Sequence, residues 1–277
     1  MSNSEIYPLG RDKAESSRLN DQHKLIMDIV GGPIDKTVPL DNVSSVADVA
    51  TGTGVWLWDA QRVLNAHSAQ DRYYHGFDIS DAQFPSTHGI ELSVQDVLKP
   101  FPSEHHNRYD LVHVRLLVAA ITQSQTEAAV SNLMTILKPG GYLQWIEVDF
   151  TGLEEGIAQH PKPAPALRAW SKFVDQNNIS RCAPGTLSIA FEKLGFLNTT
   201  NRSSFVRGRE ELKARAQAWI LQFYATVLPL VLLKTGEAPP EQVGQRTAEI
   251  LRGLEEYSAE GGLLDVRFGT VVGRKPL

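Results

Sequence analysis

The stretch that decides the fold is Val46-Ala47-Asp48-Val49-Ala50-Thr51-Gly52-Thr53-Gly54. It begins with the small and β-branched residues of a buried strand and then breaks into two glycines. Apolar side chains recur at helical spacing from Val55 to Asn65. Glycines let the backbone turn tightly beside a ligand, and the unpaired N–H groups at a helix start face that ligand. We therefore expect a small polar cofactor at this turn.

A second acidic residue indicates the kind of cofactor. The run from Tyr73 to Ile79 predicts a strand that ends at Asp78. An acidic side chain at the tip of the second strand can accept hydrogen bonds from a ribose diol. A two-glycine turn alone is also compatible with plain packing. Asp78 moves the interpretation toward a cofactor that contains a nucleoside.

The central part of the chain alternates strands and helices. Further strands are predicted over 90–97, 109–117 and 142–148, with a helix over 125–137. This order predicts the α/β class, with a doubly wound, mostly parallel sheet covered by helices on both faces. Ligands of such sheets bind outside the carboxyl ends of the strands. Those ends carry Asp78, Asp96, Arg115, Glu147 and Asp149.

The two ends of the chain are predicted to add helical parts. A helix over 12–30 has a polar face, which is either a solvated surface or a lid that binds the cofactor through Tyr7, Arg18, Gln22 or His23. Two helices precede a last strand over 264–272. We predict a lid over 1–40, a cofactor-binding domain over 41–208 and 263–277, and a cap over 209–262. The cap carries an apolar stripe that is mostly core, with a few side chains at a substrate pocket: Trp219, Phe223, Tyr224, Leu228 and Leu232.

Composition limits the class of partner. The chain has 277 residues, 42% of them hydrophobic, and a net charge of −5, so nucleic acid is not the expected partner. The longest apolar run, 219–233, is shorter than the roughly 20 residues of a membrane span, and we expect no signal peptide. Cys182 is the only cysteine, which excludes an internal disulfide. We expect a cytoplasmic monomer that acts on a small molecule.

Five motifs together resemble the class I S-adenosylmethionine-dependent methyltransferases. They are the turn from Asp48 to Gly54, Asp78, Asp96-Val97, the run Leu137-Lys138-Pro139-Gly140-Gly141-Tyr142, and the closing run from Val272 to Pro276. The Leu-Lys-Pro-Gly-Gly run is the most specific, and it disfavours the alternative of a nicotinamide-dependent oxidoreductase. The resemblance implies a seven-stranded Rossmann-like sheet and S-adenosyl-L-methionine as cofactor.

The resemblance also implies roles for single residues. Gly52 and Gly54 would border the methionine part of the cofactor, and Asp78 would hold the ribose hydroxyls. Ile79 would pack near the adenine, and Asp96 would bond its amino group with Val97 alongside. Ala50 replaces the usual first glycine, which weakens the match slightly, and its methyl group should be tolerated if the backbone dihedrals there are ordinary. The full predicted cofactor set is Tyr7, Arg18, Gln22, Ala50, Thr51, Gly52, Gly54, Asp78, Ile79, Asp96, Val97 and Arg115.

Two further runs, 18–25 and 112–117, resemble fungal methyltransferases of secondary metabolism, a group that includes regulators of metabolite clusters. The opening run from Ile6 to Arg11 and the cap are most similar to gliotoxin bis-thiomethyltransferases. These enzymes methylate the two thiols of a reduced epidithiodioxopiperazine, so S-methylation of such a dithiol is the expected activity. The alternatives are O- or N-methylation of another metabolite, or a cofactor-binding regulator or relative that does not methylate.

A thiol acceptor would place few demands on the protein. A few per cent of a thiol is already thiolate at neutral pH, so a dedicated base is not needed. An oxygen nucleophile would more often need one, and the candidates are His113, His23, Glu147 and Asp149. We predict no catalytic residue and no metal site.

Overall fold

The computed structural model describes residues 13–85, 89–152 and 160–277. Within them, seven strands form one sheet in the order β3-β2-β1-β4-β5-β7-β6. Strands β1 to β5 are parallel, whereas β7 is antiparallel to both of its neighbours. Their bounds are β1 Ser45–Val49, β2 Tyr73–Asp78, β3 Glu91–Val94, β4 Tyr109–Arg115, β5 Leu137–Asp149, β6 Leu197–Phe205 and β7 Arg267–Arg274. The predicted doubly wound α/β sheet is confirmed.

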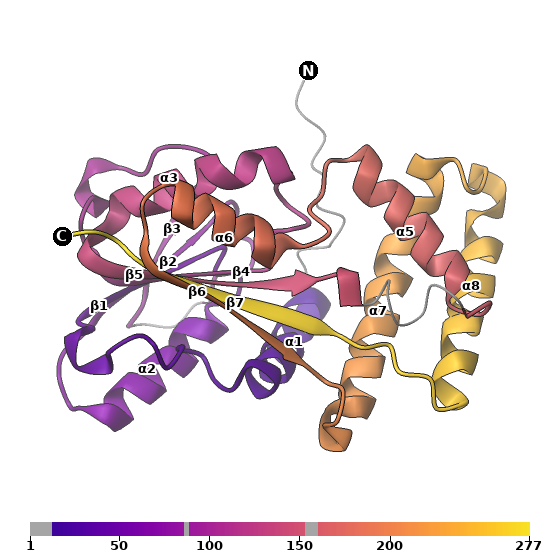
Figure 1. The fold of residues 1–277 in the computed structure, drawn as a ribbon, viewed down its shortest axis with the longest axis horizontal. Helices are drawn as coiled ribbons and strands as arrows, with labels where there is room; N and C mark the ends of the chain where they lie inside the picture. The colour runs from indigo at the N-terminus through magenta and orange to yellow at the C-terminus, as the bar shows by residue number, and fades with distance from the viewer. Residues whose placement is uncertain (1–12, 86–88, 153–159) are drawn as a thin grey trace.

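Helices cover both faces of the sheet and one of its ends (Figure 1). One face carries α1 (Lys13–Val30) and α2 (Val55–His67), and the other carries α3 (Thr126–Ile136) and α6 (Ala183–Lys193). Beyond the carboxyl ends of the parallel strands lie α5 (Ala164–Gln176), α7 (Glu210–Thr235) and α8 (Val243–Ala259). The strand ends predicted to carry the site therefore face this helical group.

The two faces of the sheet have separate apolar cores. Every residue of β1 is buried, as its continuous run of apolar and small residues predicts for a central parallel strand. The core on the α1 side also contains the carboxyl-terminal half of α1, where Ile26 and Ile29 are buried together with Tyr224 and Leu228 of α7. Half of the predicted lid helix is thus permanent core.

The run after α3 differs from its prediction. We expected 138–141 to be a turn before a strand at 142, but β5 begins at Leu137. The ladder pairs Tyr109 with Leu137 and then Leu111 with Tyr142, so the glycine run forms a bulge inside the strand. Lys275 holds this bulge, because its Nζ donates to the carbonyl oxygens of Met134 and Leu137 at 2.8 and 2.7 Å.

The helices α7 and α8 lie between β6 and β7, where the cap was predicted. By length and composition α7 could cross a membrane, but it packs against α1, α5 and α8. The domain prediction had placed α5 in the cofactor-binding part, whereas in the structure α5 packs against α7 and α8. The division of the chain into lid, cofactor-binding domain and cap stays a prediction.

A glycine in β7 marks where the sheet meets α6 most closely. A Cβ added at Gly269 would lie 2.3 Å from the Cβ of Pro184. We expect Gly269→Ala to lower the free energy of unfolding by about 1–3 kcal/mol, because an overpacked interior must shift to make room. Urea unfolding measures this. Gly244→Ala in α8, where a Cβ would have no neighbour within 4 Å, is the control and should leave stability unchanged or raise it by up to about 1 kcal/mol.

Candidate functional site

The glycine turn lies between β1 and α2, as predicted. Gly52 and Gly54 have φ of 53° and 71°, in the left-handed region that glycine adopts without strain. Gly54 is the N-cap of α2 and provides no capping side chain. The first N–H groups of α2 therefore face the turn without a side-chain acceptor.

Ala50 corrects one expectation from the sequence. We expected an alanine to be tolerated here on the condition that the backbone dihedrals are ordinary, but Ala50 has φ of 61°. This left-handed conformation costs an alanine roughly 1–2 kcal/mol relative to its ordinary conformations. Its neighbour Thr51 is held firmly, since its N–H donates to the Phe77 carbonyl at 2.9 Å and its hydroxyl to Asp48 at 2.8 Å. The Thr51 side chain consequently points to the interior.

Asp48 is a buried carboxylate beneath the turn. Besides Thr51 it binds His113, whose Nδ1 lies 2.7 Å from Oδ1. The His113 ring stacks on Trp56 of α2, with ring centroids 3.8 Å apart and planes within 2°. Burial lowers the pKa of His113, so the imidazole is neutral and donates to Asp48. The strands β1 and β4 and helix α2 are thereby fixed around the turn.

The two predicted acidic residues lie at the tips of β2 and beyond β3. Asp78 accepts hydrogen bonds from the N–H groups of Gly52 at 2.8 Å and Ser80 at 3.2 Å. Burial raises the pKa of Asp78, and these N–H groups partly oppose the shift. Asp96 accepts one bond from the Leu98 N–H at 2.9 Å, and Val97 beside it is buried. Ile79, directly after Asp78, is 58% exposed.

The inner face of α1 covers the turn. The Thr53 hydroxyl donates to Asn20 Oδ1 at 2.8 Å, and Leu19 lies 3.6 Å from the place of a Cβ on Gly52. Gln83 lies equally near on the other side, through its Oε1. None of these three residues was predicted. Leu19 and Asn20 belong to the run 18–25 named in the sequence analysis. Only the rotation of α1 about its axis in the structure shows that these two residues face the turn and that Arg18 lines the neighbouring cavity.

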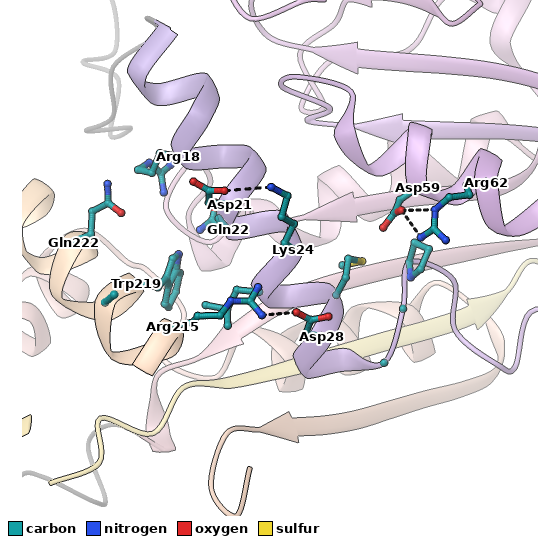
Figure 2. A pocket seen from close by; sticks show the side chains of 16 residues that line it. Arg18, Asp21, Gln22, Lys24, Asp28, Asp59, Arg62, Arg215, Trp219 and Gln222 are labelled. Atoms are coloured by element: carbon teal, nitrogen blue, oxygen red, sulfur yellow. Dashed lines mark hydrogen bonds and ion pairs between the residues drawn. The ribbon is translucent and has the colours of Figure 1, made fainter. Parts of the chain in front are cut away.

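Arg18 and Gln22 line a different space. They border a cavity of about 980 Å³ between α1, α2 and α7 (Figure 2). Trp219 and Gln222 of α7 line the same cavity from the opposite side. Gly52, Asp78 and Asp96 are not among the residues that line this cavity. A cofactor role for Arg18 and Gln22 stays a prediction, and Tyr7 lies outside the described residues.

Arg115 extends from the tip of β4 next to the turn. Its Nη1 lies 2.9 Å from Nδ1 of His23 on α1, and Nε2 of His23 lies 3.1 Å from Asp59 on α2. Burial and the nearby Arg115 charge lower the pKa of His23 to about 4, so it is neutral at physiological pH. Although burial acts to raise the pKa of Asp59, hydrogen bonds from Arg62 and His23 lower it overall. The sequence showed both His23 and Arg115 but not their contact.

All four candidate bases have structural partners. His113 and His23 are held by Asp48 and Asp59. Asp149 accepts hydrogen bonds from the N–H and hydroxyl of Thr151 at 3.0 and 2.6 Å. Each of them is thus held by a neighbouring residue, and the choice of no catalytic base stays a prediction.

Glu147, like His113, is almost completely buried. Its Oε1 accepts hydrogen bonds from the backbone N–H groups of Leu117 and Val118 and from Trp145 Nε1. These bonds hold the chain after Leu116, which has a left-handed φ of 56°. Its Oε2 is buried and has no hydrogen-bond partner among the described residues. Glu147 therefore shapes the end of β4.

The predicted cap stripe divides into core and surface-facing parts. Tyr224, Leu228 and Leu232 are buried. Trp219 and Phe223 are only partly buried, and their rings lie 6.2 Å apart. Among the side chains that the structure describes, no group of three or more His, Cys, Asp or Glu could hold a metal ion.

The buried Glu147 predicts a dependence of stability on pH. Burial raises its pKa to about 7, so the folded protein favours the protonated form, and its contribution to stability is lost as the pH rises from about 4.5 to 7. We expect wild-type protein to lose on the order of 3 kcal/mol of unfolding free energy through this group over that interval. Glu147→Gln, which keeps an acceptor oxygen, should lack this loss. Urea unfolding at pH 5 and pH 8 measures it, and a wild-type-to-variant difference that does not change with pH would contradict the prediction.

No family model matches the chain. It is similar to Methyltransferase grgD of Penicillium sp, with 40% identity over 261 residues that cover 88% of each chain. N-methyltransferase verN of Clonostachys rogersoniana is 25% identical over 264 residues, covering 92% of this chain and 86% of that protein. N-methyltransferase gliN of Aspergillus fumigatus is 30% identical over 171 residues, which cover 61% of this chain and 58% of that protein.

Solved structures share the fold at low identity. Phosphoethanolamine N-methyltransferase 2 of Haemonchus contortus, bound to S-adenosyl-L-methionine, has a TM-score of 0.52 and 14% identity, covering 93% of this chain and 53% of that one. Human N-acetylserotonin methyltransferase with the same cofactor has a TM-score of 0.51 and 13% identity, covering 96% and 57%. The chain thus spans about half the length of these two enzymes.

The predicted Rossmann-like methyltransferase fold is confirmed, and the cofactor of this class of enzymes is S-adenosyl-L-methionine, as predicted. By its similarity to the Penicillium protein over most of both chains, this chain belongs to the fungal methyltransferases of secondary metabolism.

Proposed function

We propose that the protein transfers a methyl group from S-adenosyl-L-methionine to the thiols of a reduced epidithiodioxopiperazine, such as dithiol gliotoxin. The observation that carries the choice of acceptor is that a structural partner holds each candidate base through at least one of its polar atoms, while His113 Nε2 and Glu147 Oε2 have no hydrogen-bond partner among the described residues. His113 is bound to Asp48, and Oε1 of Glu147 accepts three N–H groups. A thiol supplies its own nucleophilic thiolate and does not require such a base.

The strand tips support the placement of the cofactor. The methionine part would lie on the turn at Gly52, where the backbone approaches without a side chain. Asp78 would accept the ribose hydroxyls in addition to its present N–H donors. The exposed Ile79 would cover one face of the adenine, and Asp96 has a second carboxylate oxygen for its amino group. In this arrangement the adenine would cover the exposed Ile79 side chain.

The chain's contribution to the reaction is positional. The bound sulfonium supplies the methyl group, and the nucleophile must approach it in line. Orientation of two reactants can supply roughly 7–11 kcal/mol of barrier lowering. The rigid attachment of the turn to Asp48 and Asp78 favours this role, because the surface that receives the cofactor is already fixed.

The aromatic side chains of α7 support an apolar acceptor. Phe223 contacts Trp170 and Trp219, with ring centroids 5.1 and 6.2 Å away. Phe150, directly after β5, lies 5.1 Å from Trp170. These rings connect the end of the sheet to the cap, and partly buried aromatic side chains are typical of small-molecule pockets.

N-methylation is the second candidate. It is favoured by the names of two relatives, the N-methyltransferases verN and gliN, whose similarity reaches 25% and 30% identity. A neutral nitrogen can also attack the methyl carbon without prior removal of a proton. A third possibility is a relative that binds the cofactor without methylating, since a secondary metabolism regulator of Hypocrea atroviridis is 31% identical over 170 residues.

Mass spectrometry of reaction products separates these candidates. The purified protein is incubated with S-adenosyl-L-methionine and, in parallel, with a reduced epidithiol and with its amine and phenol counterparts. We expect two successive gains of one methyl on the dithiol, blocked when its thiols are first alkylated. Methylation of the amine substrates alone would establish N-methylation, and tight cofactor binding with no methylated product would favour the regulator.

A substitution at Asp78 tests the cofactor site. We expect Asp78→Ala to weaken S-adenosylhomocysteine binding by about 1.5–3 kcal/mol, the usual contribution of a charge-assisted hydrogen bond. Isothermal titration calorimetry measures this. Asp81→Ala removes an exposed carboxylate from the same loop and is the control. Equal affinities of the wild type and the Asp78 variant would show that the ribose binds elsewhere.

A further inference from the structure

We propose that His23 is a positioning residue that aims the Arg115 guanidinium at the carboxylate of the cofactor's methionine part. This inference rests on the proposed function, because it needs the cofactor at the glycine turn. It concerns one chain of contacts, Arg115–His23–Asp59, which joins the tip of β4, the inner face of α1 and the first turns of α2.

The protonation of His23 follows from its neighbours. A guanidinium has only N–H donors, so Nδ1 of His23, 2.9 Å from Arg115 Nη1, must be the acceptor. The proton of the neutral ring is then on Nε2, which donates to Asp59 at 3.1 Å. Asp59 is in turn held by Arg62 at 2.7 Å. The carboxylate therefore selects the tautomer that can receive Arg115.

Arg115 is short of a negative partner. Over the described ranges, no carboxylate oxygen lies within 4.0 Å of its guanidinium, although most of its side chain is covered. Burial lowers the pKa of Arg115 to about 10, and the charge of the nearby Asp48 only partly opposes this shift. Buried charges in proteins are normally paired, and a guanidinium matches a carboxylate in a bidentate arrangement. The missing partner is a carboxylate supplied by a ligand.

The place of Arg115 fits the methionine end of the cofactor. Val114 is paired with Val49 in the sheet, so Arg115 lies next to Ala50 at the start of the turn. Asn20 bonds Thr53 one helical turn before His23, so α1 lies across the same turn. A cofactor with its methionine part on Gly52 would present its carboxylate between β4 and α1.

The identity of residue 23 matters for this role. An acidic side chain at this position would neutralise Arg115 and compete with the incoming carboxylate. A neutral imidazole instead fixes one edge of the guanidinium and leaves its charge available. Orientation without neutralisation is what distinguishes His23 from an ordinary ion-pair partner.

Two ligands that differ in the methionine part test the proposal by calorimetry. S-adenosylhomocysteine has the amino acid carboxylate, whereas 5′-methylthioadenosine lacks it. His23→Leu removes the acceptor, and His23→Asn keeps an acceptor oxygen close to the place of Nδ1. Lys24→Ala, an exposed change on the same helix, is the control.

We expect His23→Leu to bind S-adenosylhomocysteine about tenfold more weakly and methylthioadenosine within about twofold of wild type. His23→Asn should stay within about threefold for both ligands. In turnover, KM for the methyl donor should rise about tenfold in the leucine variant while kcat stays within about threefold, because the contact is made equally in the ground and transition states.

Three results would overturn the inference. The first is an equal loss of affinity for both ligands in His23→Leu. The second is an unchanged affinity of His23→Leu for S-adenosylhomocysteine, and the third is a tenfold loss of affinity for that ligand in His23→Asn. If the leucine variant does not fold, the asparagine variant decides alone by whether its affinity stays near wild type. If the wild type binds neither nucleoside, the proposed function is refuted. If the wild type binds both and the variants change the two affinities equally or not at all, only the role of His23 is refuted.

Discussion

One buried carboxylate, Asp48, determines how the ends of the central strands are arranged. It receives hydrogen bonds from Thr51 in the turn and from His113 in the neighbouring strand, and both donors are buried with it. Removal of either partner would leave a carboxylate oxygen without compensation in the interior, which is costly. The turn consequently has one conformation, including the left-handed Ala50, and the Gly52 N–H is directed at Asp78.

Helix α1 has two roles that depend on its two halves. Its carboxyl-terminal half is part of the core shared with α7, so the helix cannot leave the sheet as a whole. Its amino-terminal half contacts the turn through Leu19, Asn20 and His23. Under the proposed function, a helix anchored at one end and polar at the other would provide a cover that is already near its position in the complex with the cofactor. Preorganisation of this kind reduces the entropic cost of binding.

The ionisable groups near the glycine turn connect elements of the fold, which suits the orienting role that we propose for the site. His113, His23 and Glu147 each connect two or more elements, and the pKa shifts of all three follow mainly from burial. None of the three lines the cavity of about 980 Å³ between α1, α2 and α7. A reaction whose leaving group needs no proton and whose nucleophile ionises readily is compatible with such a site. Under the proposed function, the same rigid arrangement would also suit another soft acceptor.

The sequence by itself determined the α/β sheet, the glycine turn, the acidic residues at the strand tips and the family, because these depend on local periodicity and on short motifs with fixed spacing. Only the tertiary structure decided which face of α1 meets the turn, that Arg18 and Gln22 border a separate cavity, and that His23 joins Arg115 to Asp59. It also showed the left-handed backbone at Ala50 and the bulge after Leu137. The physical reason is that helical phase and long-range hydrogen bonds depend on how the elements pack, and residues 23, 59 and 115 come together only after the sheet has formed.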